Sequence, residues 1–285
     1  MSILSVQSHV AYGYVGNRAA VFPLQRLGFD VWAVNTVQFS NHTGYGSWTG
    51  EIFTPEHISS VLSGIFERAP LDSCEAVLSG YLGAAKLGET ILSTVDRVRE
   101  ARPTALYTCD PVMGDVGRGI FVQPEIPDFM KQRAVPAADI ITPNQFELEL
   151  LTGETPSDLE HAIEAAHKAR TLGPEVVVVT SLRTSETPDD SIEMLAVSGE
   201  GAWRVRTPML PLEIPPNGAG DAVTALFLAH FLKTHSAPDS LAAMAAAVFE
   251  IISATLQAGT RELQLIAAQD RFVSPDKRFT PEKVG

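Results

Sequence analysis

Short apolar runs alternate along this chain with segments that have the spacing of helices. Within each run the apolar residues are continuous, which is typical of a parallel strand buried on both faces. We predict such strands at Ile3–Val6, Val31–Val37, Ala76–Leu78, Ala105–Cys109, Ile140–Ile141 and Val176–Val179. A later pair of runs, Met194–Val197 and Ala202–Val205, predicts an antiparallel hairpin that turns at Gly199-Glu200-Gly201.

The segments between these strands place apolar residues three and four positions apart. Ile58–Phe66 and Leu241–Ile252 both follow this helical spacing. Ser157-Asp158-Leu159-Glu160 is a candidate capping box that opens a helix through Ala169. Strand–helix alternation over most of the chain predicts an α/β fold with right-handed crossovers. Because no linker or internal repeat interrupts the pattern, we expect one domain over residues 1–285.

Composition narrows the class of protein. The formal charge of −13 argues against binding to nucleic acid or to an anionic membrane. The most apolar late segment, Leu241 to Leu256, contains Glu250 and is short for a bilayer span. The N-terminus lacks the features of a signal peptide, so we expect a cytoplasmic protein. Cys74 and Cys109 form no CxxC pair and are expected to be reduced, buried thiols.

Polar and glycine-containing clusters fall directly after the predicted strands. In open α/β sheets, ligands bind outside the carboxyl ends of the strands. We therefore expect five clusters to converge on one rim: Ser8-His9, Ser79-Gly80-Tyr81, Asp110–Asp115, Asn144–Glu147 and Thr180-Ser181.

The segment Asn217–Asp221 precedes a helical run from Ala222 to Leu232. Its glycines free backbone amides, and the helix N-terminus adds positive partial charge, so the segment suits a phosphate group. We expect Gly220 to need a positive φ and close approach to phosphate. Asp221 in the first turn could accept the proton of an attacking hydroxyl. The alternative is an ordinary glycine turn with a first-turn acid.

Two acidic segments are candidates for a metal site. Asp110 and Asp115 lie in a segment that follows a predicted strand, and their carboxylates suit a magnesium ion that bridges ATP phosphates. A turn with solvated acids is the alternative. Asn144 and Glu147 share one face at a helix start, where a capping box would explain both residues without any ligand.

Two further loops suit a small planar ligand. Ser8–Asn17 combines a hydroxyl, aromatic side chains and glycines, and Ser40–Gly46 has a similar character. A lone histidine is more often structural than functional. His42 becomes a candidate because of its neighbours in the second loop.

Taken together, these segments resemble the successive motifs of pyridoxal kinases, in the ribokinase-like superfamily. The resembling segments are Ser8–Asn17, Ser40–Tyr45, Ser79–Gly83, Asp110–Asp115, Thr142–Glu147 and Gly218–Asp221. The resemblance extends from Ile3 to about Asp270. The stretch Asn35–Thr43 distinguishes the chain from the sugar kinases of the same superfamily.

The resemblance implies a three-layer α/β/α ribokinase-like sandwich with a mostly parallel central sheet, assembled as a homodimer. It implies ATP-dependent phosphorylation of the hydroxymethyl group of pyridoxal, with pyridoxamine and pyridoxine as further acceptors. Mg²⁺ is the implied metal, and a monovalent cation such as K⁺ is a further candidate.

The resemblance also implies roles for individual residues. Asp221 would be the catalytic base. The acceptor would be bound by Ser8, His42, Thr43, Gly44, Tyr81 and Asp221. The nucleotide would be bound by Asp110, Thr142, Asn144, Glu147, Thr180, Thr207, Pro208, Met209, Leu210, Gly218, Ala219 and Gly220. The metal and its waters would be organised by Asp110, Asp115 and Glu147.

The chain departs from its apparent relatives at three positions. Gly44 replaces a frequent glutamine, so we expect a roomier acceptor pocket. Thr180 replaces a lysine found in some relatives, which removes a charge near the phosphates. Ala219 replaces a threonine common in the superfamily.

Three other functions compete with this interpretation. A hydroxymethylpyrimidine kinase shares the fold and chemistry, but the stretch Asn35–Thr43 argues against it. A non-catalytic pyridoxal 5′-phosphate carrier would not need Asp221. A dinucleotide-binding oxidoreductase is disfavoured because no GxGxxG follows the first strand.

Overall fold

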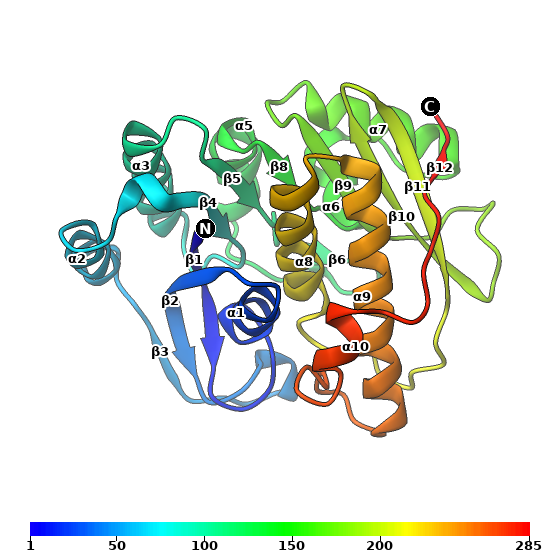
Figure 1. Ribbon diagram of the computed structural model, residues 1–285, viewed down its shortest axis with the longest axis horizontal. Coiled ribbons are helices and arrows are strands. Elements are labelled where there is room, and N and C mark those ends of the chain that lie inside the picture. The colour runs from blue at the N-terminus through cyan, green and yellow to red at the C-terminus, as the bar shows by residue number, and fades with distance from the viewer.

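A ten-stranded sheet runs through the centre of the protein, with helices on both faces (Figure 1). The computed structural model describes residues 1–285. The strand order is β12-β11-β10-β9-β8-β5-β4-β1-β2-β3. The bounds are β1 Ser2–Val10, β2 Asp30–Phe39, β3 Gly50–Ile52, β4 Cys74–Ser79, β5 Leu106–Cys109, β8 Ile140–Ile141, β9 Val176–Leu182, β10 Ser191–Ser198, β11 Gly201–Pro208 and β12 Glu282–Lys283. A separate small hairpin joins β6, Gly114–Asp115, to β7, Gly119–Ile120.

Six strands of the sheet, from β9 to β2, are parallel, and the flanking strands are antiparallel. The predicted parallel strands are thus confirmed. The predicted hairpin is also confirmed as β10 and β11, but its pairing already starts at Ser198 and Gly201. The turn is therefore Gly199-Glu200, one residue shorter than expected.

The helices form two layers. Their bounds are α1 Asn17–Arg26, α2 Pro55–Phe66, α3 Ala85–Ala101, α4 Ile126–Phe129, α5 Val135–Ala137, α6 Gln145–Thr152, α7 Leu159–Arg170, α8 Ala219–Thr234, α9 Ala237–Gln257 and α10 Gln269–Val273. Shorter helical turns cover Thr43–Tyr45, Leu71–Ser73 and Met130–Ala134. A core of 36 buried residues lies under α2 to α7, and one of 34 lies under α1 and α8 to α10. Both faces of the sheet are therefore covered, which explains why its strands lack polar alternation.

Helix α7 is confirmed, but it begins one residue later than predicted and its cap differs. The side chain of Asp158, not Ser157, accepts the hydrogen bond from the His161 amide. Both residues have capping side chains, and the chain enters the helix one residue later than the capping-box pattern predicted.

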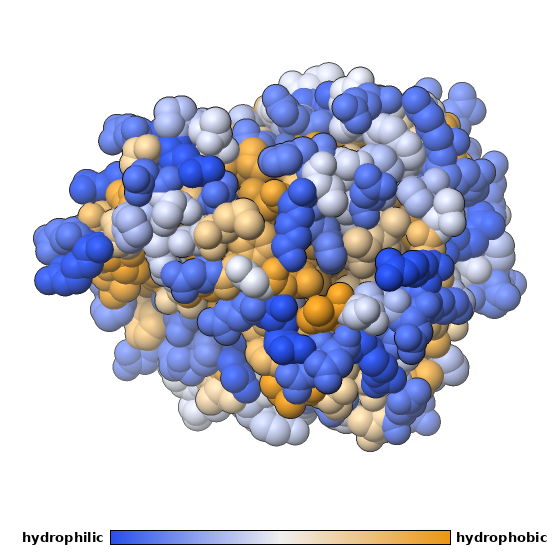
Figure 2. Space-filling model, viewed as in Figure 1, coloured by the Kyte–Doolittle hydropathy of each residue, from blue (hydrophilic) through white to orange (hydrophobic).

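Helix α9 is 21 residues long, and by length and composition it could cross a bilayer. The expectation from the sequence concerned only the segment Leu241 to Leu256, and the helix extends beyond that segment at both ends. However, 61% of its most apolar stretch is buried inside the protein, and α9 packs on β10, β11, α8 and α10. The outer surface of this face mixes hydrophilic and hydrophobic side chains, without one continuous hydrophobic patch (Figure 2).

The parallel strands all end at the same edge of the sheet, so the five polar clusters that follow them lie at that edge as predicted. β11 is antiparallel to β10, which is antiparallel to β9, so β11 ends at this same edge. The segment Thr207–Leu210 therefore emerges beside the end of β9, although it is nearly 30 positions later in the chain.

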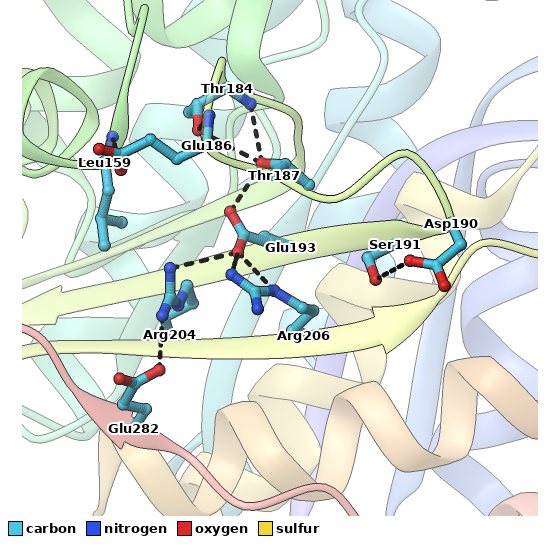
Figure 3. A network of polar contacts seen from close by, with 10 residues as sticks. All are labelled: Leu159, Thr184, Glu186, Thr187, Asp190, Ser191, Glu193, Arg204, Arg206 and Glu282. Atoms are coloured by element: carbon cyan, nitrogen blue, oxygen red, sulfur yellow. Dashed lines mark hydrogen bonds and ion pairs between the residues drawn. The ribbon is translucent and has the colours of Figure 1, made fainter.

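A buried ion cluster fixes the outer strands beside this edge (Figure 3). The Glu193 side chain, 1% exposed, points from β10 toward Arg204 and Arg206 of β11. It also accepts a hydrogen bond of 2.8 Å from the Thr187 hydroxyl, in the loop before β10. Arg204 reaches on to Glu282 at 2.6 Å, which ties the C-terminal strand β12 to the same cluster. Every charge in the cluster has a partner, as burial requires.

Candidate active site

The acceptor end of the site is built from the loops that follow β1, β2 and β4. The hydroxyl groups of Ser8, Thr43 and Tyr81 make no hydrogen bond within the chain, although Ser8 is buried and Tyr81 is partly buried. Polar groups in such positions normally have partners. These three hydroxyls are therefore free to bond a ligand.

His42 is held by its own loop. Its Nδ1 accepts a hydrogen bond of 3.1 Å from the Gly44 amide, which places the ring proton of the neutral form on Nε2. Burial, followed by the positive charges of Arg118 and Arg261, lowers the pKa of His42 below its ordinary value. At neutral pH this ring is therefore an uncharged wall rather than a cation.

The space directly beside Gly44 is occupied. A Cβ atom there would lie 2.8 Å from Nδ1 of His42 and 3.6 Å from Nη2 of Arg261. The first distance is too short for atoms that are not bonded, so a side chain would displace the His42 ring. The roomier pocket expected at Gly44 stays a prediction, although the His42 ring occupies the space directly beside its Cα atom.

The glycine loop precedes α8 as predicted, but the essential glycine is a different one. Gly218 is the N-cap residue of α8 with φ of 83°, and a Cβ atom there would overlap the Tyr14 carbonyl oxygen. Gly220 has no such φ, and its Cβ would lie 3.9 Å from the Asp110 carboxylate, an ordinary contact. The conformational requirement for glycine therefore falls on Gly218, not on Gly220, while the close approach of Gly220 to phosphate stays a prediction.

Asp221 lies in the first turn of α8 and is partly buried. Burial raises its pKa to about 6, although hydrogen bonds from the backbone amides of Gly16 and of Asp221 itself oppose the shift. A carboxylate with this pKa is ionised at neutral pH and is a better proton acceptor than an exposed aspartate.

Asp110 lies near both Glu147 and Asp221. Burial, followed by the negative charges of Glu147 and Asp221, raises the pKa of Asp110 well above its usual range. Burial raises the pKa of Glu147 to about 7, against the effect of hydrogen bonds from the amides of Asn144, Met113 and Gly114. The capping box of Asn144 and Glu147 is confirmed, and Glu147 additionally bonds the segment after β5.

These carboxylates concentrate negative charge beside the glycine loop that precedes α8. Asp110, Glu147 and Asp221 bring excess negative charge together, and Asp115 adds to it beside Glu147. No three acidic, histidine or cysteine side chains form a complete metal site of their own. A magnesium ion typically takes one or two protein carboxylates and completes its shell with water and substrate phosphates.

The predicted nucleotide residues lie along the ends of β8, β9 and β11. Thr142 shares a 2.7 Å hydrogen bond with Thr224 of α8, whose hydroxyl donates to the Gly220 carbonyl. Asn144 pairs with Thr180 through a single parallel bridge. The anion loop, β8 and β9 are thus linked directly.

Two further features mark the nucleotide side. Ser181 has a positive φ of 54°, which is uncommon for a residue with a side chain and turns the chain at the end of β9. Thr207 is buried, whereas Met209 and Leu210 are partly exposed beyond the end of β11. This segment offers an apolar surface beside the strand ends.

Three charged residues near His42 were not predicted from the sequence. Arg118 comes from the β6–β7 hairpin, and Arg261 and Glu262 come from the segment after α9. None of them belongs to a motif with a chemical signature. Only the folded structure brings them to the acceptor end.

Comparisons with known proteins identify the family of this chain. Residues 31–265 match the family model described as phosphomethylpyrimidine kinase. The chain is 57% identical over 285 residues to the pyridoxal kinase PdxY of Rubrobacter xylanophilus, covering 100% of this chain and 98% of the relative. It is 54% identical over 287 residues to that of Deinococcus radiodurans, covering 99% and 96%.

A solved structure shows the same architecture. Pyridoxal kinase from Leishmania donovani, in complex with ADP and pyridoxamine, superposes with a TM-score of 0.90 at 31% identity, covering 100% of this chain and 99% of that one. The three-layer, mostly parallel sandwich predicted from the sequence is therefore confirmed as the ribokinase-like fold. On this evidence the chain belongs to the pyridoxal kinase family.

Proposed function

We propose that this protein transfers the γ-phosphoryl group of ATP to the hydroxymethyl group of pyridoxal, and to that of pyridoxamine or pyridoxine. The observation that carries the proposal is Asp221 in the first turn of α8, which follows the Gly218 turn and accepts a hydrogen bond from the Gly16 amide in the loop after β1. The relatives named pyridoxal kinase, and the ADP and pyridoxamine bound in the Leishmania donovani enzyme, support it.

In this reaction Asp221 takes the proton of the acceptor hydroxyl while that oxygen attacks the γ-phosphorus. The bond from phosphorus to the β-phosphate oxygen breaks, and ADP leaves with that oxygen. The first amides of α8, including those of Ala219 and Gly220, have no partner four residues back and face the transferring group. They stabilise the negative charge that the phosphoryl group carries.

The remaining residues are proposed to bind and orient the two substrates. Ser8 and Thr43 bond substituents of the pyridine ring, and Tyr81 and the neutral His42 form walls beside it. Thr180 and the segment Thr207–Leu210 lie along the nucleotide, with Thr142 holding the anion loop in place.

Mg²⁺ is the proposed metal, with K⁺ as a candidate for a second cation. When bound, Mg²⁺ neutralises phosphate charge. Asp110, Asp115 and Glu147 are the residues that would hold it and its waters. Replacing Glu147 with Ala is expected to raise the magnesium concentration for half-maximal rate by about tenfold, as loss of a supporting ligand typically does. An unchanged magnesium dependence would remove Glu147 from the site.

The acceptor hydroxyls give a separate prediction. Ser8→Ala and Thr43→Val should each raise KM for pyridoxal by an amount corresponding to about 1–3 kcal/mol, with KM for ATP nearly unchanged. Because neither hydroxyl has a partner within the chain, the thermal midpoints should stay near that of the wild type. Thr43→Ser keeps the hydroxyl and serves as the control. Lower midpoints with unchanged pyridoxal kinetics would contradict the assignment.

The pKa of Asp221 predicts the pH dependence. Since burial raises this pKa to about 6, the carboxylate is protonated below that pH and cannot accept a proton. kcat/KM for pyridoxal should therefore fall as the pH is lowered from about 8 to about 5, with an inflection that belongs to the free enzyme. A flat profile over this range would argue against Asp221 as the base.

The best single test is a coupled assay of ADP release with pyridoxal, pyridoxamine, pyridoxine and hydroxymethylpyrimidine. Hydroxymethylpyrimidine kinase activity is the second candidate, because the matching family model is described as phosphomethylpyrimidine kinase, a name that refers to a related pyrimidine. Turnover with the pyrimidine alone would replace the main proposal, and no turnover with any acceptor would favour the non-catalytic carrier.

The setting of the reaction is also proposed. We propose that the chain acts as a single kinase domain, since one sheet takes strands from residue 2 to residue 283. The protein is proposed to work as a cytoplasmic homodimer. It is also proposed to have no nucleic-acid or membrane partner, because its net charge of −13 would repel anionic surfaces. Light scattering on the purified protein tests the dimer.

A further inference from the structure

The carboxylate of Glu262 joins two loops of the acceptor end. Its Oε1 accepts a hydrogen bond of 2.5 Å from the Tyr45 hydroxyl, in the loop after β2. Its Oε2 accepts one of 3.2 Å from the Tyr14 amide, in the loop after β1. The segment that carries Glu262 follows α9 and passes beside both loops (Figure 1). Residues far apart in sequence are thus held by one side chain.

The backbone of Glu262 reaches a third loop. It pairs in a single parallel bridge with Asn217, which directly precedes Gly218 of the anion loop. The Glu262 amide donates to the Thr260 hydroxyl, and the Gln264 side chain donates to the Glu262 carbonyl. Glu262 is only 7% exposed, so its position is fixed from its own segment.

The residues around the Glu262 carboxylate leave space for it and hold its partner Tyr45 in place. Gly13 has φ of 94°, and a Cβ atom there would overlap the Glu262 side chain. Arg261 places its guanidinium 4.3 Å from the centre of the Tyr45 ring. Burial and the hydrogen bond to Glu262 raise the pKa of Tyr45 to about 12, so its hydroxyl remains a donor at any working pH.

The contacts of Tyr14 extend to the catalytic residue. Its carbonyl oxygen lies where a Gly218 side chain would be, and two residues later the Gly16 amide bonds the Asp221 carboxylate. A shift of Tyr14 would therefore move both the wall of the anion loop and a donor to the proposed base.

We propose that Glu262 is a positioning residue for the acceptor substrate, which holds the Thr43–Tyr45 turn and the Tyr14–Gly16 segment in the geometry that binds the ring. The proposal rests on the proposed function for the identity of the acceptor. Glu262 itself acts through the two loops and touches neither the hydroxyl nor the phosphoryl group.

The test compares Glu262→Ala with Glu262→Gln. The amide of glutamine can accept from the Tyr14 amide through its oxygen, and its NH₂ can donate to the Tyr45 hydroxyl, which then turns to accept. Alanine loses both bonds. We expect Glu262→Ala to raise KM for pyridoxal by at least about tenfold with KM for ATP unchanged, and Glu262→Gln to restore most of the difference.

Two further measurements keep the test decisive if the alanine variant folds poorly. Tyr45→Phe removes one bond at a partly exposed residue and should raise KM for pyridoxal without altering KM for ATP. Hydrogen exchange at the Tyr14 amide should accelerate in Glu262→Ala whatever the acceptor is. Glu89→Gln, which loses only a surface pair with Arg133, is the control and should match the wild type.

The outcomes separate the two proposals. If the wild type does not phosphorylate pyridoxal, the proposed function fails, and exchange at the Tyr14 amide still decides whether Glu262 holds the loop. If the wild type is active and either both KM values rise equally or the Tyr14 amide exchanges at the wild-type rate, Glu262 is not a positioning residue for the acceptor.

Discussion

Replacing Asp221 with Asn is expected to lower kcat by about 10²- to 10⁴-fold, the usual cost of losing a general base. Asparagine has nearly the same shape and can still accept the hydrogen bond from the Gly16 amide. It cannot take a proton from the acceptor hydroxyl, so the loss should appear in kcat rather than in either KM. Steady-state kinetics with both substrates varied measures this directly.

Two observations would accompany this loss if Asp221 is the base. ATP binding, measured by calorimetry, should stay within a small factor of the wild-type value. The inflection near pH 6 in the pH profile should disappear with the carboxylate that causes it. Near-normal turnover in Asp221→Asn would assign the base to another residue.

Replacing Gly218 with Val should both destabilise the protein and abolish most of its activity. A residue with a side chain in this left-handed conformation costs about 1–3 kcal/mol of stability. The added Cβ would also overlap the Tyr14 carbonyl, so the loop before α8 must move. A displacement of about 1 Å at a reacting group can lower the rate by about 10²-fold. Thermal unfolding and kcat/KM measure the two effects.

Gly220→Ala and Ala219→Thr are the matched controls for this prediction. The Cβ of an alanine at position 220 would lie 3.9 Å from the Asp110 carboxylate, and no positive φ opposes it. Both variants should keep a near-normal thermal midpoint and most of the activity. If Gly220→Ala is as damaging as Gly218→Val, then approach to phosphate, rather than backbone conformation, sets the glycine requirement.

The part of the fold that could be predicted is the part with a strong local pattern. The continuous apolar runs at β1, β2 and β9 reveal buried parallel strands because both faces of the sheet are covered. The strands β3, β6 and β12 have two or three residues and lack a continuous apolar run, so no pattern in the sequence indicates them. Their existence depends on the strand or loop beside them.

The residues of the candidate site also fall into two groups, those that a local sequence pattern predicts and those that it does not. Asp221 and the Asn144–Glu147 capping box could be found because their chemistry lies within five consecutive residues. The choice between Gly218 and Gly220 could not, since it depends on the carbonyl of Tyr14 about 200 positions earlier. Glu262 bonds Tyr45 across 217 positions of the chain, so no local sequence pattern could predict the role of Glu262.

The outer strands described above also limit how molecules of this protein can meet. A long sheet normally exposes unpaired backbone groups at its two borders, where another chain can add strands and start a polymer. Here the borders are β3, with three residues, and β12, with two, both charged. The ion pair between Arg204 and Glu282 holds β12 against β11, where the C-terminal segment pairs with Ala202, Trp203 and Arg204. Border strands this short and charged offer a second molecule little backbone to pair with, which disfavours polymerisation through the sheet.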